Sequence, residues 1–153
     1  NNAQWLKGLP EPQWQIFGGD LPALFRTDEA RFAPHTGYLV ADPERVAYWR
    51  ERLATDLGPG RKVGISWRGG SHLTRTRSRS LATEDWAPIL GTPGCRFVNL
   101  QYGNYLPELA DINARFGNVV HDYPEALTDY DETAALVAAL DQLVTVCTAI
   151  VHL

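Results

Sequence analysis

Lys62-Val63-Gly64-Ile65-Ser66-Trp67-Arg68-Gly69-Gly70 is the segment that decides the fold. Its first six residues form a short, mostly apolar run, which predicts a buried β-strand. The two adjacent glycines that follow allow the chain to turn sharply or to approach a ligand closely. Similar runs recur at residues 96–101, 118–121 and 142–146, so this segment is the first of four predicted strands.

Helical patterns separate these strands. Asp42, Pro43 and Glu44 begin the first helix as its cap, its first residue and an acid of its first turn. Apolar residues then recur at helical spacing until Gly58. Further helices are predicted from about Thr83, over residues 107–116 and 131–140, and from Thr148 onward.

Strands that alternate with helices predict an α/β fold, a Rossmann-like parallel sheet with helices on both faces. The near-continuous apolar strands agree with this, because both faces of such a sheet are buried. In the strand order 3-2-1-4, Leu143-Val144-Thr145-Val146 lies at an edge and is too apolar for an exposed one. We therefore expect a sheet that is truncated after the fourth strand, or a partner that pairs with this edge.

Residues 1–41 predict no long helix, because prolines and glycines interrupt them. Their aromatic and aliphatic content is too high for a disordered linker. We expect an extended arm or interdomain linker over residues 1–41, packed against this domain or another one, and a single domain over residues 42–153. The sequence contains no Met, which we expect of a piece of a longer protein.

Composition and charge exclude several classes of protein. The formal net charge of −4 argues against a general nucleic-acid binder. No apolar run approaches the roughly 18 residues of a membrane span. Cys95 and Cys147 are too few for a disulfide framework or a metal site, so we expect two buried free thiols in the reducing cytoplasm.

A doubly wound sheet binds ligands beyond the carboxyl ends of its strands, where the strand order reverses. In the order 3-2-1-4 this point lies between the first and fourth strands. The turn Trp67–Gly70 therefore faces the segment Cys147–Ala149 across one crevice. The turn matches neither the dinucleotide-binding fingerprint nor a Walker loop.

Arg75, Arg77 and Arg79 alternate with small hydroxyl residues just after this turn. Arginine forks bind phosphate oxygens, so the segment is either a diphosphate clamp or a solvated loop, and for Arg79 we favour phosphate binding. At the start of the last helix, Thr148 and the free backbone N–H groups predict an anion site, the alternative being a simple cap. His152, four residues on, shares its predicted face and is either a ligand or a packed histidine.

Gln101-Tyr102-Gly103-Asn104 follows the second strand at the same edge of the sheet. An aromatic and polar loop at this place is suited to stacking on a base or to hydrogen bonding a ribose. The alternative is an ordinary turn built around Gly103.

Several of these segments together resemble one family. Residues 42–53 are similar to the linker helix that precedes the C-terminal domain of bacterial tetratricopeptide-repeat glycosyltransferases, and residues 63–69 to the first strand and loop of that domain. Residues 79–81, 96–103 and 131–153 resemble further motifs of the domain, in the same order. The family belongs to the heptosyltransferase-like group, glycosyltransferase family 9, whose GT-B fold forms the active site between two Rossmann-like domains.

The resemblance implies the donor-binding part of a metal-independent, inverting glycosyltransferase, with a nucleotide-diphosphate sugar as substrate and no cofactor. It also implies an N-terminal GT-B domain that supplies the catalytic base, upstream helical repeats, and no catalytic residue or metal ligand in this chain. Arg79 lies seven residues before Trp86, where such enzymes have a basic residue, commonly Lys, that binds donor phosphate. The fold and the resemblance together give the candidate ligands: Arg68, Gly69, Gly70, Arg79 and Thr148 for phosphate; Gln101, Tyr102, Gly103 and Asn104 for the nucleoside; and Cys147 and His152 for the sugar.

One departure from the family pattern bears on activity. The family has Asp-Thr-x-x-x-His where this chain has Cys147, Thr148 and His152, so a carboxylate that could accept sugar hydroxyls is missing. Two hypotheses follow: an enzyme part, or a non-catalytic nucleotide-binding or protein-interaction module of the same fold. Nucleic-acid binding through Arg75, Arg77 and Arg79 is a third, disfavoured by the net charge and by the few stacking aromatics nearby.

Overall fold

The computed structural model describes residues 10–11, 13–32, 34, 39–70 and 76–153, with the side chains of residues 76 and 77 left aside. The chain divides into two compact units, Asn1–Tyr38 and Leu39–Leu153. The first unit contains α1 (Leu21–Phe25) between two 3₁₀ turns, Gly18–Asp20 and Glu29–Arg31, and none of these elements buries a residue. The sequence places the boundary between residues 41 and 42, whereas the compact units meet between Tyr38 and Leu39.

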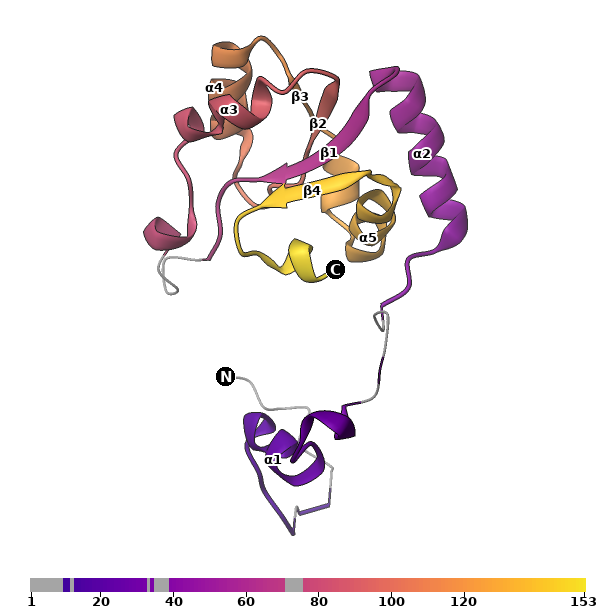
Figure 1. The fold of residues 1–153 in the computed structure, drawn as a ribbon, viewed down its shortest axis with the longest axis vertical. Helices are drawn as coiled ribbons and strands as arrows, with labels where there is room; N and C mark the ends of the chain where they lie inside the picture. The colour runs from indigo at the N-terminus through magenta and orange to yellow at the C-terminus, as the bar shows by residue number, and fades with distance from the viewer. Residues whose placement is uncertain (1–9, 12, 33, 35–38, 71–75) are drawn as a thin grey trace. The chain divides into compact units, whose positions relative to one another are not determined.

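The second unit is a four-stranded parallel sheet with helices on both faces, which confirms the predicted fold class (Figure 1). The strand order is β3-β2-β1-β4, as predicted. The strands are β1 (Arg61–Ser66), β2 (Cys95–Asn99), β3 (Val120–His121) and β4 (Gln142–Thr145). The helices are α2 (Pro43–Leu57), α3 (Ala87–Leu90), α4 (Leu106–Phe116) and α5 (Tyr130–Ala139).

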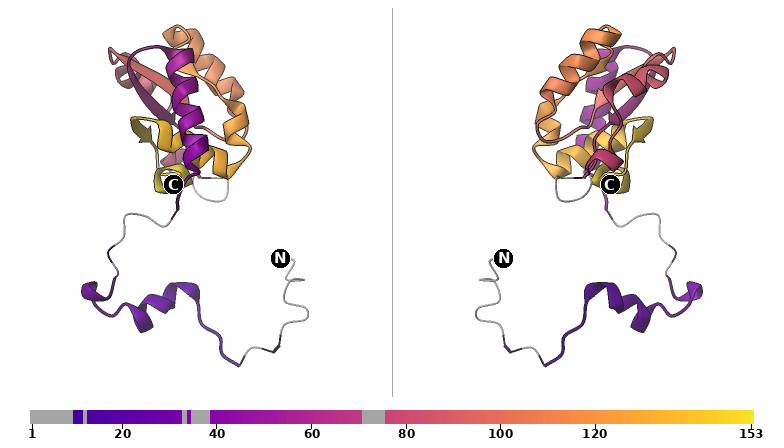
Figure 2. Two further views of the ribbon diagram at one scale, coloured as in Figure 1. Left: turned by 90° about the vertical axis from the view of Figure 1, so that its right-hand side faces the viewer. Right: turned by 90° about the vertical axis from the view of Figure 1, so that its left-hand side faces the viewer.

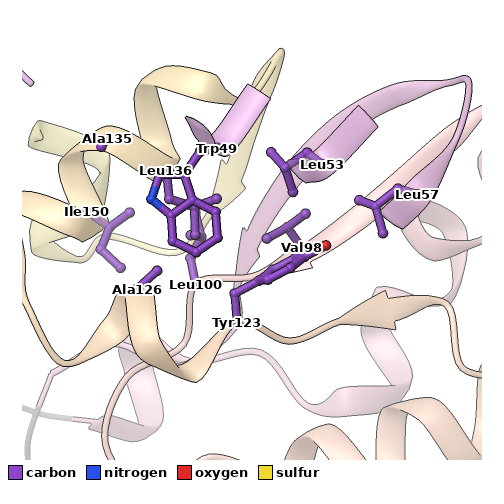
Figure 3. Packing of buried hydrophobic residues seen from close by; sticks show 10 residues of the cluster. All are labelled: Trp49, Leu53, Leu57, Val98, Leu100, Tyr123, Ala126, Ala135, Leu136 and Ile150. Carbon is purple, nitrogen blue, oxygen red and sulfur yellow. The ribbon is translucent and has the colours of Figure 1, made fainter. Parts of the chain in front are cut away.

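Helices lie on both sides of the sheet (Figure 2), and a hydrophobic cluster fills each face. On one face α2 and α5 pack together, and Figure 3 shows Trp49 and Leu53 of α2 beside Leu136 of α5. On the other face α3 and α4 cover β1, β2 and β3. Side chains of a strand alternate between faces, so Phe97 and Val98 of β2 belong to different clusters.

Two predicted helices differ in the structure. The helix from Thr83 divides into a 3₁₀ turn, Thr83–Trp86, and the single-turn α3. Pro88 lies at the start of α3, where its missing N–H group costs no internal hydrogen bond. In the middle of a continuous helix the same proline would break it. The last helix is a 3₁₀ turn, Ala149–His152. Among the described residues, no helix is long and apolar enough to cross a membrane.

β4 is an edge strand of this sheet, since it pairs with β1 alone among the described strands. Leu143, Val144 and Thr145 are half-buried. The expectation that another strand covers this edge stays a prediction.

A polar contact joins α2 to α5. Arg45 donates from Nε and Nη2 to the two carboxylate oxygens of Glu132, at 2.6 and 3.0 Å. Trp49 Nε1 donates to Glu132 Oε2 at 2.9 Å. The hydrogen bonds from Arg45 hold the pKa of Glu132 below its usual value, and Trp49 adds to this effect. Because both partners are partly exposed, solvent screens the pair and its stabilisation is modest.

We predict that Glu132→Gln lowers the free energy of unfolding near pH 7 and not in acid. A carboxyl group with a lowered folded-state pKa contributes stability above its unfolded value, 4.5, and loses it as the pH falls through the folded value. Urea unfolding of both proteins from about pH 7 to about pH 3 measures the difference. Glu51→Gln, at an exposed acid of the same α2, is the control. A difference for Glu132→Gln that does not shrink in acid contradicts this account.

Gly64 allows the centre of β1 to pack against three leucines. A Cβ atom at this position would lie 2.5 Å from a methyl carbon of Leu100, 2.7 Å from one of Leu140 and 2.9 Å from one of Leu143. Real carbon atoms do not approach so closely, so any side chain here would displace the α5 side of the core.

We predict that Gly64→Ala lowers the free energy of unfolding by about 1–3 kcal/mol, the usual cost of overpacking a filled core. Thermal and urea unfolding measure the change. Leu143→Ala opens space beside the new methyl group. The double variant should therefore lose less free energy of unfolding than the two single variants lose together. Strict additivity would show that the contact with Leu143 is not part of the cause.

Candidate functional site

The loops after β1 and β4 touch at Gly69. A Cβ atom there would lie 2.8 Å from the carbonyl oxygen of Cys147 and 2.9 Å from that of Arg79. Both oxygens belong to the backbone, so they cannot rotate away as a side chain could. At the place where the sequence predicts a crevice between the first and fourth strands, the two loops are in direct backbone contact.

The loop after β1 folds back on itself. Gly69 N donates to Arg79 O at 3.0 Å, and Leu81 N donates to Trp67 O at 2.9 Å. Arg68 and Ser80 form an antiparallel bridge between these bonds. Gly70 has a φ of 75°, which favours glycine at the turn. Arg75 and the side chain of Arg77 lie outside the described residues, so their predicted role stays a prediction.

Arg79 reaches across to the loop after β4. Its Nη2 donates to the carbonyl oxygen of Cys147 at 2.8 Å and lies 3.7 Å from Cys147 Sγ. The guanidinium group thus lies at the contact between the two loops. Cys147 itself is exposed and Cys95 is half-buried. The expectation of two buried thiols is therefore wrong: Cys147 lies in the loop after β4, and Cys95 is the first residue of β2.

Arg68 is held by an acid that sequence reasoning missed. Arg68 Nε lies 3.0 Å from Glu108 Oε1 on α4, and its Nη2 donates to Asn104 O at 3.0 Å. Glu108 Oε2 also accepts from Trp67 Nε1 at 3.0 Å. The sequence offered little signal for Glu108 beyond its place in the first turn of a helix. This carboxylate neutralises Arg68, so the side chain is better suited to fixing the loop than to binding phosphate.

Gln101 is turned inward, away from the place predicted for a nucleoside ligand. Its side chain is 1% exposed. Its Oε1 accepts from Ser66 Oγ at 3.0 Å, from Trp67 N at 3.2 Å and from Arg68 N at 2.8 Å. The residue holds the end of β1 from the neighbouring strand and leaves Tyr102, Gly103 and Asn104 exposed beside it.

The carboxyl ends of β2 and β3 are joined by further polar contacts. Asn99 Nδ2 donates to Asp122 Oδ1 at 2.7 Å, and Asn99 Oδ1 accepts from Gln101 N at 2.8 Å. Tyr105 OH donates to Asp122 Oδ2 at 3.1 Å. Burial, together with the negative charge of Asp122, raises the pKa of Tyr105 to about 12. Tyr105 therefore stays a hydrogen-bond donor at physiological pH.

Thr148 is buried at the start of the last turn. It is 4% exposed, and its Oγ1 has no hydrogen-bond partner within the described part of the chain. Its side chain does not cap the turn that follows. Buried hydroxyl groups are usually paired, so this one is a candidate donor to a ligand. His152 is exposed. It ends a 3₁₀ turn, in which residues three apart, and not four, share a face.

A pocket of about 380 Å³ opens beside this edge, on the face that carries α5. Two exposed tyrosines, Tyr102 and Tyr130, contribute aromatic rings to its wall. The predicted site residue Tyr102 is thus brought next to the segment that follows Thr148. The remaining lining residues are Leu127, Thr133, Ala149 and Ile150.

The structure brings most predicted site residues to one edge, in two groups. Gly69, Arg79 and Cys147 meet at the loop contact, and Tyr102 lines the adjacent pocket. Within the described residues, no group of three or more His, Cys, Asp or Glu side chains is placed to hold a metal ion.

Comparison with curated proteins finds a relative that matches most of this chain. The chain is similar to Protein FlbA of Caulobacter vibrioides. The two are 39% identical over 144 residues, which is 92% of this chain and 24% of that protein. The chain therefore spans about a quarter of the length of its relative. No family model matches the sequence, and no solved structure matches it.

We predict that Gly69→Ala separates the two loops, because its methyl group would collide with two backbone oxygens. The backbone amides of residues 69 and 81, which close the loop after β1, should exchange with solvent about tenfold faster or more. Hydrogen exchange followed by NMR measures this. Cys147→Ala keeps the carbonyl oxygen in place and should leave both amides protected. Unchanged exchange in Gly69→Ala would show that the loops have room for a side chain.

Proposed function

We propose that this chain is the donor-binding part of a glycosyltransferase of the heptosyltransferase-like GT-B group, and that the carboxyl edge of its sheet binds a nucleoside diphosphate sugar. The observation that carries the proposal is the contact of the loops after β1 and β4 at Gly69, where the Arg79 guanidinium donates to the carbonyl oxygen of Cys147. The sequence resemblance predicts a phosphate site at this place. The similarity to the Caulobacter protein is compatible with the proposal and names no activity.

The pocket between Tyr102 and Tyr130 is the proposed place for the nucleoside. Its volume and largely apolar lining suit a flat base, and aromatic rings favour stacking on it. Thr133, which also lines the pocket, is already engaged, since its hydroxyl lies within hydrogen-bond distance of the carbonyl oxygens of Ala126 and Asp129 and can donate to either. Base selection would therefore rest on shape and on backbone groups of the loop after β2.

Arg79 and Thr148 are the proposed contacts for the diphosphate. A guanidinium group carries five N–H donors, and the anchoring contact to Cys147 O engages one nitrogen, Nη2. Within the described residues the Thr148 hydroxyl has no hydrogen-bond partner, and a phosphate oxygen would supply one. As a sugar leaves the donor, negative charge grows on the diphosphate, and fixed donors of this kind stabilise it without a metal. The base that activates the acceptor would come from another domain of the whole protein.

A second candidate is a non-catalytic nucleotide-binding module of the same fold. The exposed thiol of Cys147 favours it, because it stands where the resembled family has a carboxylate for the sugar. In either case we place the protein in the cytoplasm, where two free thiols remain reduced. An N-terminal GT-B domain and helical repeats are the proposed neighbours in the whole protein, and nucleic acid is not among its proposed partners.

We predict that the chain binds ADP or UDP and that Arg79→Ala weakens this binding by about 1–3 kcal/mol, the cost of a lost charge-assisted hydrogen bond. Isothermal titration calorimetry with both nucleotides measures it. Arg61→Ala is the matched control, since Arg61 is an exposed arginine at the opposite end of β1. If neither nucleotide binds the unaltered chain, the donor-site proposal fails.

Cys147→Asp distinguishes an enzyme part from a binding module. In the whole protein, sugar transfer that appears or increases with this change would indicate an enzyme whose sugar contact has decayed. Nucleotide binding without transfer in either form would favour the binding module.

A further inference from the structure

Gln101 occupies a special position at the carboxyl edge of the sheet. Its side chain holds the end of β1, and its backbone N–H is held by Asn99 Oδ1 of β2. Asn99 in turn donates to Asp122, which follows β3. One line of hydrogen bonds therefore runs across the ends of three strands, and Gln101 joins its two halves.

The two halves lead to different parts of the proposed site. Through its Oε1, Gln101 fixes the backbone N–H groups of Trp67 and Arg68, where the loop to Gly69 and Arg79 begins. Directly after Gln101 in the chain comes Tyr102, which lines the nucleoside pocket. The Nε2 of Gln101 also approaches Tyr102 O at 3.4 Å.

We infer that Gln101 is a positioning residue that couples the nucleoside pocket to the phosphate-binding loop, an inference that rests on the proposed function. A base that settles against Tyr102 fixes the backbone at residues 101 and 102. Gln101 then holds the loop after β1 more firmly, and with it the contact at Gly69 where Arg79 lies. Binding of the nucleoside therefore prepares the loop for the diphosphate. Hydrogen-bond networks can carry coupling of this kind, and the buried Gln101 Oε1 supplies the link here.

The coupling depends on the carbonyl oxygen of this side chain. A buried amide N–H without an acceptor is costly. If Gln101 Oε1 were lost, the backbone N–H groups of Trp67 and Arg68 would lose their acceptor, and the loop would move until they found another. A methionine at position 101 has a similar length and keeps the packing, but it cannot accept these bonds well. The pocket wall at Tyr102 would remain.

The test compares adenosine with ADP, and in parallel uridine with UDP, by isothermal titration calorimetry. For the pair that binds, the ratio of the nucleoside Kd to the diphosphate Kd measures the gain from the phosphates. Gln101→Met should lower this ratio about tenfold while the nucleoside Kd changes by less than about twofold. Ser66→Ala, which removes one donor to the same oxygen and leaves both backbone bonds, should keep the ratio.

A second measurement uses the unaltered chain, so it stands even if Gln101→Met does not fold. Hydrogen exchange by NMR should show greater protection of the Trp67 and Arg68 amides when the nucleoside alone is bound. Unchanged protection, or an unchanged ratio in Gln101→Met, overturns the coupling while nucleotide binding stands. Failure of all four ligands to bind the unaltered chain overturns the proposed function and the coupling with it.

Discussion

The approach of two loops at Gly69 is the constraint on which the candidate site depends. Strands β1 and β4 are neighbours in space and far apart in the chain, and the loops that follow them can meet only where one backbone carries no side chain. Arg79 closes the same contact from the other end of its loop. In a parallel sheet the carboxyl ends of all strands lie at one edge. The close contact at Gly69 therefore fixes how the loops at this edge lie relative to one another.

Polar side chains also fix the loop that contains Gly69. Glu108 and Gln101 bind the two residues that precede Gly69, one from α4 and one from the end of β2. Both are held in place by elements whose apolar faces fill the core. The start of the loop after β1 is thus partly ordered before any ligand binds, and a bound nucleoside would add to that order. Preorganisation of this kind lowers the cost of ordering on binding.

The sequence predicts the fold well, because strand and helix periods and the cap at Asp42 are local signals. It also predicts which loops share an edge, since that follows from strand order. It does not predict where individual side chains point. Gln101 and Tyr102 are adjacent in the chain, yet the first is buried in hydrogen bonds and the second lines a pocket. Arg68 and Arg79 look alike in sequence, but only the structure reveals that Glu108 pairs with the first. Such outcomes depend on partners more than 20 residues away.

The position of β4 has a consequence for handling the protein. Its outer row of backbone N–H and C=O groups has no partner strand among the described residues, and its side chains are only half-buried. A bare strand of this sort can serve as a template for self-association into aggregates. Solubility at high concentration should therefore depend on what covers this edge, and not on the stability of the core behind it.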